Sequence, residues 1–268
     1  AYSEEEAQPF YVNAPFGIVL VHNGNLTNAH ALRAELFSTD HRHTTTDSDS
    51  EVLLNVLAHE IEKSTRGVPL LVDDVFAAVR AVHARIKGSY AVIAMIAGHG
   101  VLAFRDPFGI RPLCLGRSKD GTVMVASESV ALEGTGHEFE RNVAPGEAVF
   151  IDMQGQVHSQ QCAAAAQLNP CIFEFVYLAR PDSVLDNISA YQPRLNPGEA
   201  LANRAAERHR RGDSDPRVQP PECHATGTSA GYSVPRRFCE EPLRRPHLYH
   251  AGAGRTQEVG APEAQRDR

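Results

Sequence analysis

The hydrophobic period changes from helical to extended part-way along the chain, and this change limits the fold more than any other feature. Apolar residues recur at helical spacing in Ala29–Phe37, Val52–Ile61 and Val75–Ile86. From Tyr90 to Met153, short apolar runs separated by turn residues have the spacing of strands. A few helices followed by many strands predict an α/β (α+β) protein built as a layered sandwich.

The composition permits a packed core and excludes several kinds of partner. Apolar residues make up 42% of the 268 residues, which suffices for one large or two modest domains. The formal net charge of -7 offers no basic face for nucleic acid. No apolar run approaches the roughly 20 residues of a membrane span, and the first residues are acidic rather than a signal peptide. We therefore expect a cytoplasmic protein that acts on small molecules, with neither nucleic acid nor membrane as a partner.

The cysteines and histidines indicate no metal site. Five cysteines, an odd number without CxxC spacing, argue against a disulfide framework and against zinc: Cys114, Cys162, Cys171, Cys223 and Cys239. His41 and His43 flank an arginine and have no acidic or thiol ligands at metal spacing, as in a solvated loop. We expect reduced, mostly buried thiols.

The polar segment His22 to Leu26 follows the apolar run Phe16–Val21, which we expect to be a buried strand. Asn23 has a side-chain amide and Gly24 an unhindered backbone N–H, the donor pair that an oxyanion hole requires. An Asn-Gly turn between strands explains the same residues without function and is far commoner. The residues alone therefore favour the turn.

A second candidate site is TTTDSDSE, Thr44 to Glu51, before a predicted helix. Asp49 or Ser50 can cap that helix, and carboxylates at a helix start are explained by free N–H groups and by the helix dipole. Alternatively, Asp47 or Asp49 turns outward and holds the ammonium group of an amino-acid substrate. The sequence does not choose between them.

The segment Arg105 to Leu113, RDPFGIRPL, has the composition of a turn flanked by two arginines, and SES follows at Ser127 to Ser129. We interpret this region as a turn anchored by buried hydrogen bonds.

Several longer stretches occur together in an order that resembles bacterial amidophosphoribosyltransferase. They are EAQPFYVNAPFGIVLVHNGNLTNAHALRAELF, TTTDSDSEVLLNVLAHEI, FRDPFGIRPLCLGR, VMVASESVAL, VAPGEAVFID and NPCIFEFVYLARPDSV. Related glutaminase domains share mainly the HNG and SDSE segments, whereas Cys171 to Ser183 singles out this family.

The resemblance implies an N-terminal-nucleophile hydrolase fold, a four-layer αββα sandwich that is incomplete here, joined to a phosphoribosyltransferase domain. In that family a cysteine at the mature N-terminus attacks glutamine, and the released ammonia displaces pyrophosphate from phosphoribosyl pyrophosphate. The product is 5-phosphoribosylamine, in the first step of purine synthesis. Carried over by position, Asn23 and Gly24 would donate to the oxyanion and Asp49 would bind the α-ammonium of glutamine.

The resemblance also implies cofactors, assembly and a limit on activity. Mg²⁺ is expected for the full transferase domain, and the family forms homo-oligomers. Cys171 matches an iron–sulfur ligand of some branches, but we interpret it as a buried thiol and expect no cofactor in this chain. None of the cysteines matches the nucleophile, so we expect this polypeptide to have no glutaminase or transferase activity. Two alternatives stay open: another glutaminase domain, such as that of glucosamine-phosphate synthase, and a non-enzymatic glutamine-binding module.

The last part of the chain has a different character. Residues 209–268 contain many arginines, no lysine and no sustained hydrophobic period. Read one nucleotide later, His209 to Pro216 admits IDVVIPI and Glu240 to Ala253 admits KNRYVGRTFIMPGQ, both typical of the family's transferase domain. We therefore predict a glutaminase domain over 1–165, a connection into the transferase domain over 166–208, and an out-of-frame, disordered segment over 209–268.

Overall fold

A six-stranded antiparallel sheet forms the centre of the computed structural model, which describes residues 4–65 and 69–194. The short 3-10 helix η1 (Glu4–Glu6) precedes it. The strand order is β1-β2-β3-β4-β8-β9, and every neighbouring pair is antiparallel. The bounds are β1 (Phe10–Val12), β2 (Ile18–Leu26), β3 (Gly88–Ile96), β4 (Gly100–Arg105), β8 (Glu147–Asp152) and β9 (Val157–Gln161).

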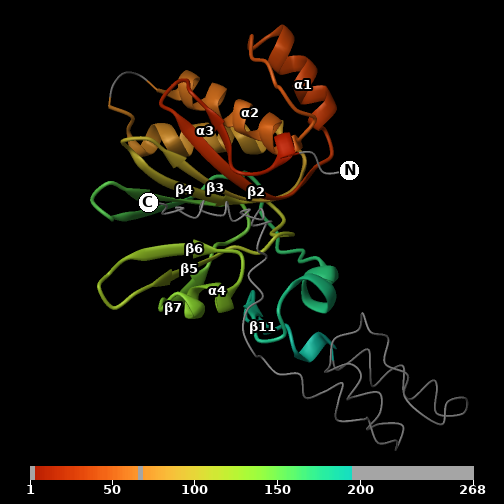
Figure 1. Cartoon of the computed structure of the whole chain (residues 1–268), viewed down its shortest axis with the longest axis vertical. Helices are drawn as coiled ribbons and strands as arrows, with labels where there is room; N and C mark the ends of the chain where they lie inside the picture. Colours follow the sequence, from red (N-terminus) through yellow and green to blue (C-terminus); the bar gives the residue numbers. More distant parts are fainter. Residues whose placement is uncertain (1–3, 66–68, 195–268) are drawn as a thin grey trace, which may run out of the picture.

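Two helices, α2 (Asp49–Ser64) and α3 (Val72–Arg85), cover one face of this sheet, and α1 (Ala29–Ser38) packs on α2 (Figure 1). The predicted stripe of α2 is confirmed, because Leu53, Val56 and Leu57 are fully buried in the main apolar cluster together with Leu20 of β2. Burying each such side chain contributes about 1.5–3 kcal/mol, so this stripe holds α2 firmly on the sheet.

A second, three-stranded sheet lies against the other face in the order β6-β5-β7. Its strands are β5 (Cys114–Arg117), β6 (Val123–Ala126) and β7 (Glu138–Asn142), and the helix α4 (Ser129–Gly134) packs on its outer side. Leu115 of this sheet and Val149 of the large sheet share the cluster between the two sheets. The order helix, sheet, sheet, helix confirms the predicted αββα layering (Figure 1).

Several predicted boundaries were wrong. The strand expected over Phe16–Val21 is β2, which continues through Leu26, because residues 22–26 pair in register with 88–92 of β3. One of the apolar runs predicted as strands between Tyr90 and Met153, residues 122–129, is a strand only up to Ala126, and Ser129 already begins a helix. Strand β7 was missed because its sequence, EFERN, is too polar to show a strand period.

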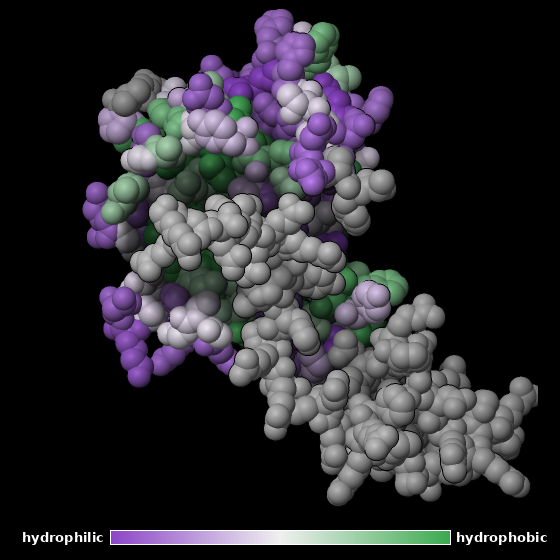
Figure 2. All heavy atoms as spheres, viewed as in Figure 1, coloured by the Kyte–Doolittle hydropathy of each residue, from purple (hydrophilic) through white to green (hydrophobic). Residues whose placement is uncertain are grey.

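The last described part of the chain packs around its own small cluster, formed by Phe175, Ala179, Leu185 and Ala190. It contains the π-helical turn η2 (Glu174–Leu178) and the hairpin of β10 (Val184–Leu185) and β11 (Ile188–Ser189). Figure 2 shows apolar residues on its surface near η2, where Ile172, Phe173 and Leu178 are exposed.

The buried Arg194 side chain donates to the carbonyl oxygens of Phe175 and Ala179, which secures η2. The boundary predicted at 165/166 falls just before this part of the chain. The predictions for residues 195–268, including the out-of-frame segment 209–268, lie outside the described residues. No helix in the described part of the chain has the length and apolar character needed to cross a bilayer.

Candidate functional site

Asn23 and Gly24 lie within β2 and not in a turn, so the interpretation as an Asn-Gly turn was wrong. Side chains alternate along the strand: His22 is buried on the helical face, and Asn23 is exposed on the opposite face. Among the described residues, no side chain or backbone group makes a hydrogen bond to the Asn23 amide. Gly24 has φ +152°, and a Cβ there would lie 2.0 Å from the Ser89 carbonyl oxygen. Only glycine fits this close approach of two strands.

Asp49 is the first residue of α2, and its carboxylate reaches back to β2. Its Oδ2 accepts a 2.8 Å hydrogen bond from the Leu26 backbone N–H. Neither Asp49 nor Ser50 caps the helix as predicted; the N-cap is Ser48, whose side chain accepts from the Ser50 N–H at 3.2 Å. The Asp49 side chain stays 24% exposed, so an anionic group remains open to solvent beside the strand of Asn23 and Gly24.

The other acidic residues of the TTTDSDSE segment have different surroundings. The Asp47 side chain is 93% exposed and pairs with Arg33 at 2.9 Å. Glu51 is buried and accepts four hydrogen bonds, from the backbone N–H and the hydroxyl of both Thr45 and Thr46. Burial raises the pKa of Glu51, but these hydrogen bonds outweigh it and hold the pKa below its ordinary value. Glu51 therefore fixes the loop, and Asp49 is the carboxylate at the strand.

His22, which the sequence did not single out, joins the strand to the helix. Its Nδ1 shares a 3.0 Å hydrogen bond with Ser50 Oγ and lies 3.9 Å from Asp49 Oδ1. Burial lowers the pKa of His22; the Asp49 carboxylate opposes this shift and the Arg111 guanidinium adds to it. The imidazole is therefore neutral at neutral pH. In the sequence, only the alternation of buried and exposed positions along the strand could have indicated that His22 faces the helices. The same alternation is found for any core residue, so it does not indicate a functional role.

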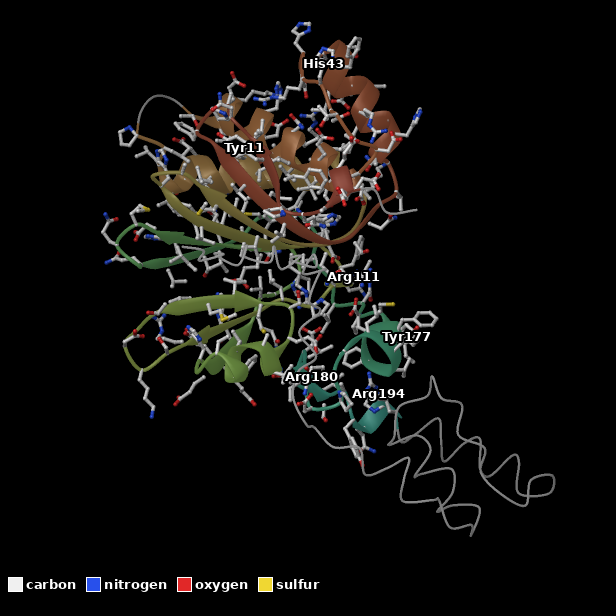
Figure 3. All side chains as sticks on the ribbon, viewed as in Figure 1. Tyr11, His43, Arg111, Tyr177, Arg180 and Arg194 are labelled. Carbon is white, nitrogen blue, oxygen red and sulfur yellow. The ribbon has the colours of Figure 1, made fainter. Side chains whose placement is uncertain are left out.

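The turn from Arg105 to Arg111 is anchored by buried hydrogen bonds, as predicted. Asp106 is fully buried and accepts from the backbone N–H groups of Tyr90, Phe108, Ile110 and Arg111. The Arg111 guanidinium pairs with Glu174 of η2 (Figure 3).

The SES segment binds the last described part of the chain. Glu128 accepts from the Arg180 backbone N–H at 2.9 Å and from the Ser183 hydroxyl. Ser129 Oγ accepts from the Val184 N–H at 2.9 Å. The SES segment therefore attaches the last described part of the chain to the sandwich.

The described cysteines differ in burial. Cys114 and Cys162 are buried, and burial raises their pKa values to about 12 and about 11. Cys171 is partly exposed, so the prediction of a buried thiol at this position was wrong. Among residues 4–65 and 69–194, no three or more His, Cys, Asp or Glu side chains are grouped to hold a metal ion.

Comparison with known proteins agrees with this fold. The family model described as a glutamine amidotransferase domain matches residues 1–134. The chain therefore belongs to the glutamine amidotransferase domain family.

Within that family the sequence is similar to proteins named amidophosphoribosyltransferase. The protein of Escherichia coli strain K12 is 48% identical over 258 residues, 95% of this chain and 50% of the relative. That of Pseudomonas aeruginosa is 54% identical over 205 residues, 75% of this chain and 41% of the relative. The chain thus spans half or less of the length of these relatives.

A solved structure gives the same result. It is glutamine phosphoribosylpyrophosphate amidotransferase from B. subtilis complexed with ADP and GMP, and it superposes with a TM-score of 0.70 at 28% identity. The superposition covers 87% of this chain and 48% of that one.

Proposed function

We propose that this chain forms the glutamine-binding part of a glutamine-dependent amidophosphoribosyltransferase. This enzyme transfers the amide nitrogen of glutamine to phosphoribosyl pyrophosphate and makes 5-phosphoribosylamine, the first step of de novo purine synthesis. The corner where β2 meets the start of α2 carries the proposal, because it brings a free amide, a glycine backbone and a fixed carboxylate together. The names of the relatives favour this enzyme over glucosamine-phosphate synthase.

Each residue of the corner has a role that follows from its chemistry. The Asp49 carboxylate holds the α-ammonium group of glutamine, since it is anionic, anchored to the Leu26 N–H and still open to solvent. Asn23 supplies its side-chain amide and Gly24 its backbone N–H to the oxyanion that forms when the glutamine amide is attacked. These donors belong to a strand held in a ladder, so they need little reorganisation during the reaction.

The reaction also requires a nucleophile, which neither buried cysteine provides. The thiols of Cys114 and Cys162 remain protonated at neutral pH because burial raises their pKa values to about 12 and about 11. The expectation that the 268-residue polypeptide has no glutaminase or transferase activity stays a prediction. Glutamine hydrolysis above background by the purified chain would contradict it.

The remaining features of the enzyme belong to the same proposal. They are phosphoribosyl pyrophosphate as the second substrate, Mg²⁺ in the transferase half, assembly as a homo-oligomer and a cytoplasmic location. The name of the B. subtilis enzyme, glutamine phosphoribosylpyrophosphate amidotransferase, supports the second substrate.

Calorimetric titration of the purified chain with L-glutamine tests the proposal. Asp49→Asn should weaken binding at least about tenfold, because a charge-assisted hydrogen bond contributes about 1.5–3 kcal/mol. Asp47→Asn is the matched control, since it removes an equal charge two residues away from a side chain that is 93% exposed, and it should leave the affinity unchanged. Absence of glutamine binding by the folded chain, or equal losses in the two variants, would overturn the proposal.

A further inference from the structure

The His22 imidazole lies between the two parts of the candidate glutamine site. Its Nδ1 edge faces α2, at 3.0 Å from Ser50 Oγ and 3.9 Å from Asp49 Oδ1. Its Nε2 edge lies beside Gly24, two residues farther along the same strand, because a Cβ added to Gly24 would lie only 2.7 Å from Nε2. The ring is thus in contact with both the proposed oxyanion strand and the proposed ammonium-binding helix.

This ring is held rigidly in place. His22 is 8% exposed, and its backbone is held by the side chain of Gln8, whose Nε2 donates to the His22 carbonyl oxygen at 2.8 Å. Gln8 Oε1 accepts from the His22 N–H. Strand β1 pairs Phe10 with Leu20, and the same register continued two residues farther places Gln8 opposite His22. The residue after Gln8 is Pro9, which has no backbone N–H to donate to the ladder. The Gln8 amide therefore replaces a peptide group of the ladder and continues the sheet to the site.

From these contacts we infer that His22 is a positioning residue that sets the separation between Gly24 and Asp49, and hence the length of amino acid that the site accepts. The inference rests on the proposed function. Glutamine can place its side-chain amide at Gly24 and its α-ammonium group at Asp49 at the same time only if the distance between these two residues matches the length of the ligand. His22 acts through Asp49 and Gly24 and need not touch glutamine.

The spacing predicts a selectivity that a purely structural histidine would not control. L-Asparagine has the same two ends as L-glutamine but one methylene less between them. The wild-type chain should therefore prefer glutamine, and one methylene is worth roughly 10–200-fold in discrimination. His22→Leu should reduce the ratio of glutamine to asparagine affinity at least about fivefold, since removal of the Ser50 contact lets α2 shift relative to β2.

Two measurements on the full chain test the inference. The first needs no ligand: amide hydrogen exchange at Leu26, whose N–H donates to Asp49 at 2.8 Å, should quicken at least about tenfold in His22→Leu relative to the core of β2. The second is the calorimetric ratio of glutamine to asparagine affinity. His59→Leu is the matched control, because His59 lies farther along the same helix, pairs with Asp40 at 3.3 Å and should change neither quantity.

A milder substitution covers the case in which His22→Leu does not fold. Ser50→Ala removes the other partner of the Nδ1 hydrogen bond and should change both quantities in the same direction. Unchanged Leu26 protection in a folded His22 or Ser50 variant would overturn the inference, as would an unchanged affinity ratio. If the wild-type chain binds neither amino acid, the proposed function fails, whereas the exchange measurement still decides whether His22 positions Asp49.

Discussion

The Arg105–Asp186 pair provides the sharpest quantitative test of how the last described part of the chain is attached to the sandwich. The Arg105 side chain is 1% exposed, and its guanidinium donates to both Asp186 carboxylate oxygens at 2.8 Å. It also donates to the carbonyl oxygens of Gly109, Arg111 and Val143. One buried cation thereby joins the end of β4, the following turn, the loop after β7 and the hairpin of β10 and β11.

The cost of disrupting this pair follows from its burial. Removing one partner of a buried ion pair costs about 3–5 kcal/mol, because the other charge is left without compensation. The free energy of unfolding of a domain is about 5–15 kcal/mol, so Arg105→Met, which also frees three carbonyl oxygens, removes a large part of it. Asp186→Asn keeps the size of the side chain and one acceptor oxygen, and should cost about 2–3 kcal/mol, the worth of a charged hydrogen bond.

Urea denaturation followed by far-ultraviolet circular dichroism measures this cost, and the chain has no tryptophan to serve as a fluorescent probe. The matched control is Asp182→Asn in the same part of the chain. The Arg180–Asp182 pair is 2.9 Å long, but its side chains are 47% and 39% exposed, so its loss should cost no more than about 1 kcal/mol. If Asp186→Asn destabilises the chain no more than Asp182→Asn does, the reasoning from burial is refuted.

Three further perturbations have defined outcomes. Gly24→Ala should lower the free energy of unfolding by about 1–3 kcal/mol and weaken glutamine binding, because φ is +152° and the added Cβ meets the Ser89 carbonyl; unchanged urea midpoints would contradict this. Glu51→Gln places an NH₂ group against N–H donors and should cost about 1–3 kcal/mol at pH 7, to be measured by urea denaturation. Burial lowers the pKa of His83 from 6.5 to about 4, so the unfolded chain binds more protons between these values. The contribution of His83 to the free energy of unfolding should therefore be fully present above pH 6.5, decrease by at most about 3 kcal/mol as the pH drops to 4, and stay constant below that. In His83→Gln, this pH-dependent loss of stability should be absent from urea denaturation curves measured between pH 4 and 6.5.

The helices and the layer order could be predicted from the sequence because burial imposes a visible period on them. The stripe of Val52, Leu53, Val56, Leu57 and Ile61 shows one buried face, and all five side chains are fully buried. Strands with apolar sequences were predicted for the same reason. Strand β7 has a polar sequence and is held by pairing with β5, a partner that lies more than twenty residues away in the sequence. No local pattern records such a pairing.

The candidate site also has features that the sequence predicted and features that it did not. The amino-acid types at Asn23, Gly24 and Asp49 were visible, and the resemblance to a family gave them roles. A local turn at Asn23-Gly24 was the favoured interpretation, because the ladder with β3 that keeps these residues extended comes from residues 88–92. Which acidic residue of the TTTDSDSE segment serves the site was also undecided, since Asp47 and Asp49 have the same chemistry and similar positions before the helix.

The sequence by itself determined the family, the helices and the chemical groups available to the site, because these depend on residue type and on spacing along the chain. Only the tertiary structure decided that Asp49 reaches β2, that Glu51 is used to hold its own loop and that His22 joins the helix to the strand. These contacts connect residues 6 to 28 positions apart and depend on which side of each element faces the other. The physical reason is that the packing of the whole core sets the distances and directions between elements, and the sequence of a short segment does not contain this information.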